Sequence, residues 1–234
     1  MIKIERFTLE SLSILNQTRE YLMSLRDTAP EHIQIGINYN IILNSAMIFE
    51  GEMEQLLHSI VTRYEEIYVR DMGHGEIKEN LVLSKSFRSF VNGIFKNTMQ
   101  QISKNTGYNN YKNMLIQLID DYVIPAEMKQ FEEGIVTLFE FRNVLAHGRS
   151  LNFEIKTHLP YPTYHVENVE EDFRGGYKRT EEYLLKKKLI NQKIIESENF
   201  YSILTNDVCN HFVEVQKRYL QECKKSIPTE FNVV

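Results

Sequence analysis

The sequence predicts an all-α protein, and two general observations favour a bundle of helices. Glycine and proline are scarce, at 10 and 5 residues in a chain of 234, so tight turns should be few. Apolar residues recur every three or four positions over most of the chain, as on helices that bury one face. There is no internal repeat, low-complexity tract or linker, so we expect a single domain over 1–234 with an elaborated segment at 149–180.

Two helices are expected in the first third of the chain. Leucines at helical spacing predict the first over residues 8–26, and Pro30 follows its end. A longer apolar pattern predicts the second over 34–70, with Gly51 inside it at a cost of about 1 kcal/mol relative to alanine. A bend at Gly51 is one reading of this glycine, and a loop is expected at 71–76.

The middle of the chain predicts a third helix and a short fourth one. Apolar spacing indicates a helix over 81–103, followed by turn residues at 105–110. Asn109 or Asn110 is the expected N-cap of the short helix, which should stop before Pro125.

The pattern changes in the last part of the chain. A helix is expected over 126–147, stopped by Gly148. Alternating residues over 151–170 then predict a small hairpin or an irregular insertion. Thr180 is the expected N-cap of a further helix, and the last helix is expected over about 197–223.

Composition limits the classes of function. The formal net charge of −5 argues against a nucleic-acid binder that relies on bulk positive charge, although it leaves room for a locally basic site. Cys209 and Cys223 lie 14 residues apart on one helical pattern, about 21 Å, which is too far for an intrachain disulfide. Neither a signal peptide over residues 1–30 nor a membrane span is expected, so we expect a cytoplasmic protein. The histidines and cysteines show no metal-ligand spacing, so we expect neither a metal site nor a cofactor.

The stretch "FRNVLAHGRS" at 141–150 carries the chemistry of the chain. On a helical wheel, Arg142 falls in the apolar stripe of its helix, one turn after Leu138. An arginine there must reach solvent, find an anionic partner, or point into an interface or cleft, because its charge is costly to bury unpaired. Asn143 and His147 are four residues apart and share an adjoining face.

This set of residues suits the cleavage of an RNA phosphodiester without a metal. His147 can move a proton to or from the reacting oxygens, and Arg142 can bind phosphate oxygens through two N–H groups. Asn143 can orient the imidazole or hold a phosphate oxygen. One histidine is one group short of an acid–base pair, which two copies facing each other in a dimer would supply.

With its arginine, polar residue and histidine, "FRNVLAHG" resembles the signature of HEPN domains, which are all-α bundles common in prokaryotic defence and toxin systems. The layout is similar as well, because a long helix containing "ILNSAMIFEGEMEQLL" lies well before the motif, and the motif ends a later helix. The resemblance covers about residues 34–150, so the segment after 149 fits no pattern that would define a substrate.

The resemblance implies a metal-independent endoribonuclease that is active as a homodimer, with both motifs lining one interfacial cleft. By position, Arg142 and His147 match the two defining residues, and Asn143 matches the polar residue between them. Glu50 borders the apolar stripe of the long helix and is expected to line the cleft, and Arg149 is expected to contact RNA. A toxin or antiviral effector of this kind implies an antitoxin or another regulatory partner, since an unrestrained ribonuclease harms its host.

Plainer interpretations stand beside this one. Arg142 can form a structural salt bridge with Glu50 or Glu54, and a histidine such as His147 favours a helix C-terminus when charged, by about 0.3–1 kcal/mol. The whole chain can also be a HEPN-like module that binds a nucleotide or a protein without catalysis, or a helical oligomer. The basic residues that follow the motif form either a rim for RNA or an ordinary solvated face: Arg149, Arg174, Lys178, Arg179 and Lys186–Lys188.

Overall fold

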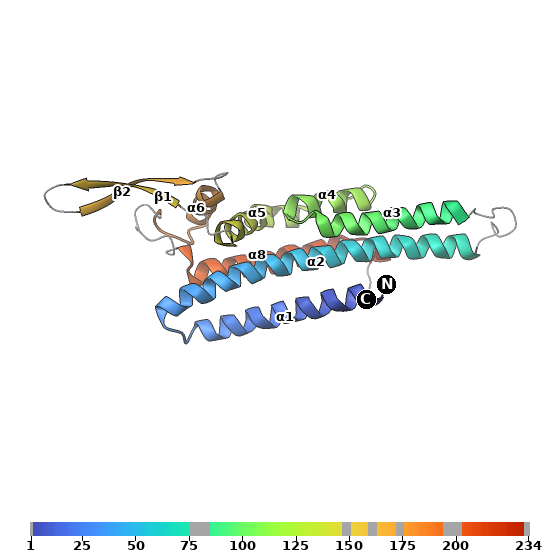
Figure 1. Ribbon diagram of the computed structural model, residues 1–234, viewed down its shortest axis with the longest axis horizontal. Helices are drawn as coiled ribbons and strands as arrows, with labels where there is room; N and C mark the ends of the chain where they lie inside the picture. The colour runs from blue at the N-terminus through green and yellow to red at the C-terminus, as the bar shows by residue number, and fades with distance from the viewer. Residues whose placement is uncertain are drawn as a thin grey trace.

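The computed structural model describes residues 2–74, 85–146, 151–158, 163–171, 176–193 and 203–231. These residues form an elongated bundle of helices with one β-hairpin projecting from one end (Figure 1). The expected all-α bundle with a hairpin after the motif is therefore confirmed in its architecture. The hairpin pairs β1 (Leu151–His158) with β2 (Thr163–Glu171) in antiparallel register, with Glu167 as the extra residue of a bulge.

α1 (Ile2–Arg26) and α2 (Glu31–His74) form an antiparallel pair along the bundle (Figure 1). The expected loop at 71–76 was wrong for residues 71–74, which continue α2. Gly51 lies inside the helix because α1 passes very close to it. A Cβ at this position would lie 2.5 Å from Cδ2 of Leu12, so any other residue here would force the Leu12 side chain to move.

α3 (Lys85–Lys104) and the short α4 (Tyr108–Leu118) lie along the opposite side of α2 from α1 (Figure 1). The N-cap expected at Asn109 or Asn110 was wrong, because α4 already begins at Tyr108. Gly107 is the residue before the helix, with φ of 103° and no side-chain cap. A glycine reaches this left-handed conformation without strain, which lets the chain reverse directly after α3.

α5 (Ala126–Ala146) has the extent predicted for the helix that carries the motif, up to its last described residue. The expected N-cap at Thr180 was wrong, because α6 (Gly176–Lys186) begins one turn earlier. The Thr180 hydroxyl instead donates to the Gly176 carbonyl inside the helix. α8 (Asn206–Ser226) is the last long helix; Thr205 caps it by accepting from the Val208 N–H, and a 3₁₀ turn, η3 (Thr229–Phe231), follows.

The core consists of two hydrophobic clusters, one in each half of the bundle. α2, α5 and α8 contribute to both clusters, so the same three helices hold the whole length of the molecule together. The first cluster adds α6 and the second adds α3 and α4. The two clusters meet along α2, where Ala46 belongs to the first cluster and Phe49 and Met53 belong to the second.

α1 joins this core with two arginines on its inner face, which the sequence analysis did not single out. Arg19 is buried; its Nη1 donates to Oε1 of Gln216 at 2.6 Å and its Nη2 to Oδ1 of Asn16 at 3.1 Å. Its Nε has no partner among the described residues, and burial lowers the pKa of its guanidinium. Arg26 is also buried, with Nε 3.3 Å from Oδ1 of Asp27.

The two cysteines lie on α8 as separate, buried thiols, as their spacing predicted. Burial raises the pKa of each thiol to about 12, so neither is a thiolate at neutral pH. Within the described part of the chain, none of the helices combines the length and apolar character that crossing a membrane requires.

Candidate functional site

Arg142 lies on α5 and forms an ion pair with α2. Its Nη2 donates to Oε2 of Glu50 at 2.7 Å, and its Nη1 donates to Oδ1 of the neighbouring Asn143 at 2.9 Å. The side chains of Arg142 and Glu50 are 25% and 18% exposed, so the pair lies at the edge of the core and one side of it meets solvent. Two hydrogen bonds use two of the five N–H groups of the guanidinium. The structure therefore contains the salt bridge between Arg142 and Glu50, which was one of the alternatives considered from the sequence.

The rest of the motif is only partly described. His147 and Arg149, the expected proton donor or acceptor and the expected RNA contact, lie outside the described residues, as does Gly148. The last described residues of α5 are held in place by α2, since the Tyr39 hydroxyl donates to the Leu145 carbonyl at 3.2 Å. This contact fixes the described end of α5 against α2.

Two opposing effects act on Glu50. Burial raises the pKa of its carboxyl above the ordinary value, and the charge and hydrogen bond of Arg142 act against that rise. Burial is the larger effect. Glu50 therefore needs Arg142 to stay ionised at this position more than an exposed glutamate would.

Tyr111 of α4 is a neighbour of this pair. Its ring is buried, and its hydroxyl has no hydrogen-bond partner among the described residues. Burial raises the pKa of this phenol, the charges of Glu50 and Glu54 raise it further, and Arg142 lowers it. All three charges thus act on the Tyr111 hydroxyl, and nothing in the helical spacing of Tyr111 distinguishes it from a plain core tyrosine.

The polar contacts continue along α2, away from Arg142. Glu54, one turn after Glu50, accepts from the Ser103 hydroxyl of α3 at 2.6 Å. One further turn on, His58 places Nε2 3.4 Å from the Met99 carbonyl and 4.0 Å from the Glu54 carboxylate. These contacts anchor the end of α3 beside the Arg142 pair. They could not be predicted from the sequence because they depend on how α3 packs.

Three of the basic residues after the motif, Arg179, Lys186 and Lys187, form surface contacts. Arg179 pairs with Glu140 at 2.7 Å and Lys186 with Glu133 at 2.8 Å, both across the α5–α6 contact. The Lys187 ammonium lies 5.6 Å from the centre of the Tyr183 ring. Arg149 and Arg174 lie outside the described residues. Arg179 and Lys186 are therefore each paired with a glutamate of α5.

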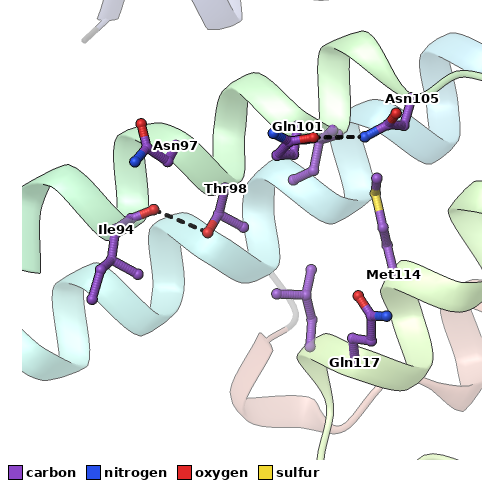
Figure 2. A pocket seen from close by; sticks show the side chains of 9 residues that line it. Ile94, Asn97, Thr98, Gln101, Asn105, Met114 and Gln117 are labelled. Atoms are coloured by element: carbon purple, nitrogen blue, oxygen red, sulfur yellow. Dashed lines mark hydrogen bonds between the residues drawn. The ribbon is translucent and has the colours of Figure 1, made fainter.

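A hollow of about 440 Å³ lies between α3 and α4 (Figure 2). Uncharged polar side chains and apolar side chains line it. Figure 2 shows two hydrogen bonds along its wall, from Thr98 to the Ile94 carbonyl and from Asn105 to Gln101. It contains no charged side chain, so it lacks the groups that phosphate binding needs. Its lining residues are Ile94, Asn97, Thr98, Gln101, Ile102, Asn105, Met114, Gln117 and Leu118.

A metal was not expected from the sequence, and no group of three or more His, Cys, Asp or Glu residues with metal-binding geometry occurs in the described ranges. No family model matches the chain, and no curated protein or solved structure matches it either. The arrangement around Arg142 must therefore be interpreted from its own chemistry.

Proposed function

We propose that this chain is a metal-independent endoribonuclease of HEPN type that works as a homodimer, as a toxin or an antiviral defence effector. The observation that carries the proposal is the placement of Arg142. Its guanidinium is held from two sides by Glu50 and Asn143 at the end of α5, directly before His147, with one side open to solvent. A guanidinium fixed in this way is oriented to receive a phosphate without first losing conformational freedom.

In the proposed reaction, the 2′-oxygen of a ribose attacks the adjacent phosphorus as its proton is removed. The bond from phosphorus to the 5′-oxygen breaks, and that oxygen takes up a proton, leaving a 2′,3′-cyclic phosphate and a 5′-hydroxyl. His147 carries one of the proton transfers, and the His147 of a second copy carries the other. Arg142 stabilises the charge on the phosphate oxygens, and Arg149 binds the neighbouring RNA.

Glu50 enters this proposal as a positioning residue. A carboxylate repels phosphate, so its contribution is to hold the Arg142 guanidinium in one orientation. The Tyr111 hydroxyl adds a buried O–H donor near the same charges.

The outer face of α2 supports the proposed dimer. Ile33 and Met47 are exposed on it, and Met47 lies one turn before Glu50. No charged residue occurs from Ile33 to Phe49, which is unusual for a helix that has a solvent-facing side. A Met47→Glu variant should therefore weaken dimer formation and RNA cleavage together, because the proposed site needs a histidine from each copy.

The direct test is cleavage of total RNA in the presence of EDTA by wild type, His147→Ala and Arg142→Ala, with analysis of the product ends. We expect cyclic phosphate ends from wild type and a loss of at least about 100-fold in each variant. Arg179→Ala is the matched control, since it also removes an arginine paired with a glutamate at 2.7 Å, and it should cleave as wild type does.

A non-catalytic module that binds a nucleotide or a protein is the second candidate, favoured by the Arg142–Glu50 pair itself, which is complete without a ligand. It predicts no cleavage by any variant and a nucleotide affinity that Arg142→Ala abolishes and His147→Ala leaves intact. Cleavage by His147→Ala at the wild-type rate would overturn the ribonuclease proposal.

A further inference from the structure

The Tyr111 hydroxyl is buried in the bundle without a hydrogen-bond partner. Tyr111 is 1% exposed, and its hydroxyl forms no hydrogen bond with the described residues. A hydroxyl in this state has given up its hydrogen bonds to water and has gained none from the protein, which costs free energy. Because such groups are rare in folded proteins, this one indicates either an ordered water or a role in another state of the molecule.

The charged groups that act on this hydroxyl are those around Arg142. Glu50, Glu54 and Arg142 all act on the Tyr111 phenol. The ring packs in the same hydrophobic cluster as Phe49, which directly precedes Glu50 on α2. Burial and, after it, the two carboxylates raise the pKa of the phenol, so it keeps its proton at neutral pH and remains a hydrogen-bond donor.

Glu50 is the carboxylate whose surroundings change when a phosphate binds to Arg142. Its Oε2 accepts from Arg142 at 2.7 Å, whereas Glu54 accepts from the Ser103 hydroxyl at 2.6 Å instead. Burial raises the pKa of the Glu50 carboxyl, so its charge depends on the donors around it. Oε1 of Glu50 is open to a second donor, since the bond from Arg142 is made to Oε2.

A bound phosphate increases the need of Glu50 for that second donor. In the free protein, Arg142 compensates the charge of the half-buried carboxylate. A phosphate on the remaining N–H groups of Arg142 brings a second anion to the same guanidinium. The carboxylate then shares its cation and is repelled by the phosphate. Tyr111 can turn its hydroxyl to Glu50 without breaking another hydrogen bond with the described residues, because it has none.

We propose that Tyr111 is a positioning residue of the RNA-bound state, an inference that rests on the proposed function: its hydroxyl donates to the Glu50 carboxylate when a phosphate of RNA occupies Arg142. This hydrogen bond keeps Glu50 ionised, and Glu50 in turn keeps Arg142 in the orientation that the phosphate requires. Tyr111 acts through Glu50 and does not touch RNA, since its side chain is enclosed. The free protein bears the cost of the unpartnered hydroxyl, and RNA binding removes it.

Tyr111→Phe tests this role because it should have opposite effects on the free protein and on the complex. Removing the unpartnered hydroxyl should raise the melting temperature of the free protein by at least about 2 °C. The same change should weaken RNA binding about tenfold, because the hydrogen bond to Glu50 is lost in the complex. The probe is a mixed-sequence 2′-O-methyl oligoribonucleotide, which cannot be cleaved because its 2′-oxygens are blocked, and fluorescence anisotropy measures its affinity.

Tyr108→Phe is the matched control. Tyr108 lies one turn earlier on α4 and is buried in the same cluster, but its hydroxyl already accepts from Tyr219 at 3.4 Å. This variant should not raise the melting temperature, and it should bind the probe as wild type does.

A double-variant cycle with Glu50→Gln shows whether Tyr111 acts through Glu50. Glu50→Gln keeps an acceptor for Arg142 and removes the negative charge. In this background, Tyr111→Phe should change the affinity for the probe by less than about twofold, because the carboxylate that it serves is gone. A role in packing alone would give the same effect in both backgrounds.

Three results would overturn the inference and leave the ribonuclease proposal intact. One is wild-type affinity for the probe in Tyr111→Phe. Another is a lower melting temperature of this variant, which would mean that the hydroxyl is already satisfied in the free protein, as by an ordered water. The third is an equal loss of affinity in the wild-type and Glu50→Gln backgrounds. Wild-type protein that neither binds the probe nor cleaves total RNA would overturn the proposed function and this inference together.

Discussion

Arg19 and Arg142 occupy equivalent-looking places in the sequence and very different places in the molecule. Each falls in the apolar stripe of a helix. Arg19 is buried between α1 and α8 and is held by amide oxygens of Gln216 and Asn16. Arg142 lies at the edge of the core, where a carboxylate and an amide hold it and one side meets solvent. Only the second arrangement leaves the guanidinium accessible to a phosphate.

The comparison shows which properties of an arginine can be predicted from its position in an apolar stripe. An arginine in such a stripe does need polar partners, and both residues have them. The pattern does not state whether the partners are neutral or anionic, or whether solvent reaches the group. The difference between a structural arginine and a candidate site therefore depends on the neighbouring helix, and it can be tested by substitution.

The largest expected effect comes from Arg19→Ala. Removing this buried side chain leaves a cavity, a buried acceptor on Gln216 and a partly buried one on Asn16, so we expect a loss of about 2–4 kcal/mol in the free energy of unfolding. Urea denaturation followed by circular dichroism measures it. A loss below about 1 kcal/mol would mean that α1 contributes little to the stability of the bundle.

Methionine substitutions separate the two arginines more sharply. Arg142→Met should cost about 1–2 kcal/mol at neutral pH, because the half-buried Glu50 carboxylate loses its partner. Arg19→Met should change the free energy of unfolding by less than about 1 kcal/mol, because filling the space and removing a buried charge with an unpaired Nε offset the lost hydrogen bonds to Gln216 and Asn16. Urea denaturation measures the loss in each variant. A larger loss for Arg19→Met than for Arg142→Met would contradict the distinction between the two arginines.

The pH dependence of stability reports on Glu50. Its folded pKa is raised, so its contribution is fully present below the ordinary glutamate pKa and is lost as the pH rises through the raised value. Relative to Glu50→Gln, wild type should therefore lose stability from about pH 4 towards neutral. The loss should be larger in Arg142→Met, where the charge that lowers this pKa is absent. A difference between wild type and Glu50→Gln that does not vary with pH would contradict this account.

The smallest effect is expected from Arg179→Ala. Its ion pair with Glu140 has the same distance as the Arg142 pair, but Arg179 is more than half exposed. We expect a change below about 0.5 kcal/mol in the free energy of unfolding. Thermal melts of wild type and Arg179→Ala at low and high salt measure this change. Because the Arg179 and Arg142 pairs have the same distance, a smaller effect of Arg179→Ala reflects its greater exposure.

The sequence predicted the helices better than their ends. Apolar periodicity located α2, α5 and the hairpin because burial of one face sets their pattern. It failed at Gly107 and Thr180, where backbone conformation and a hydrogen bond within the helix override the usual capping preferences. Glu50 and Glu54 could be named as alternative partners of Arg142 because an arginine in an apolar stripe needs an anion, and the structure selects Glu50. Tyr111 and Ser103 could not, since their polar contacts arise from tertiary packing alone.

The length of α2 has a consequence for how the molecule opens. One continuous helix forms part of both hydrophobic clusters, so its central amide hydrogens, near Ala46 and Phe49, are protected from two sides. Local opening of either half of the bundle exposes one end of α2 and leaves the centre closed. Hydrogen–deuterium exchange should therefore be slowest at that centre, and those amides should exchange only when the whole chain unfolds.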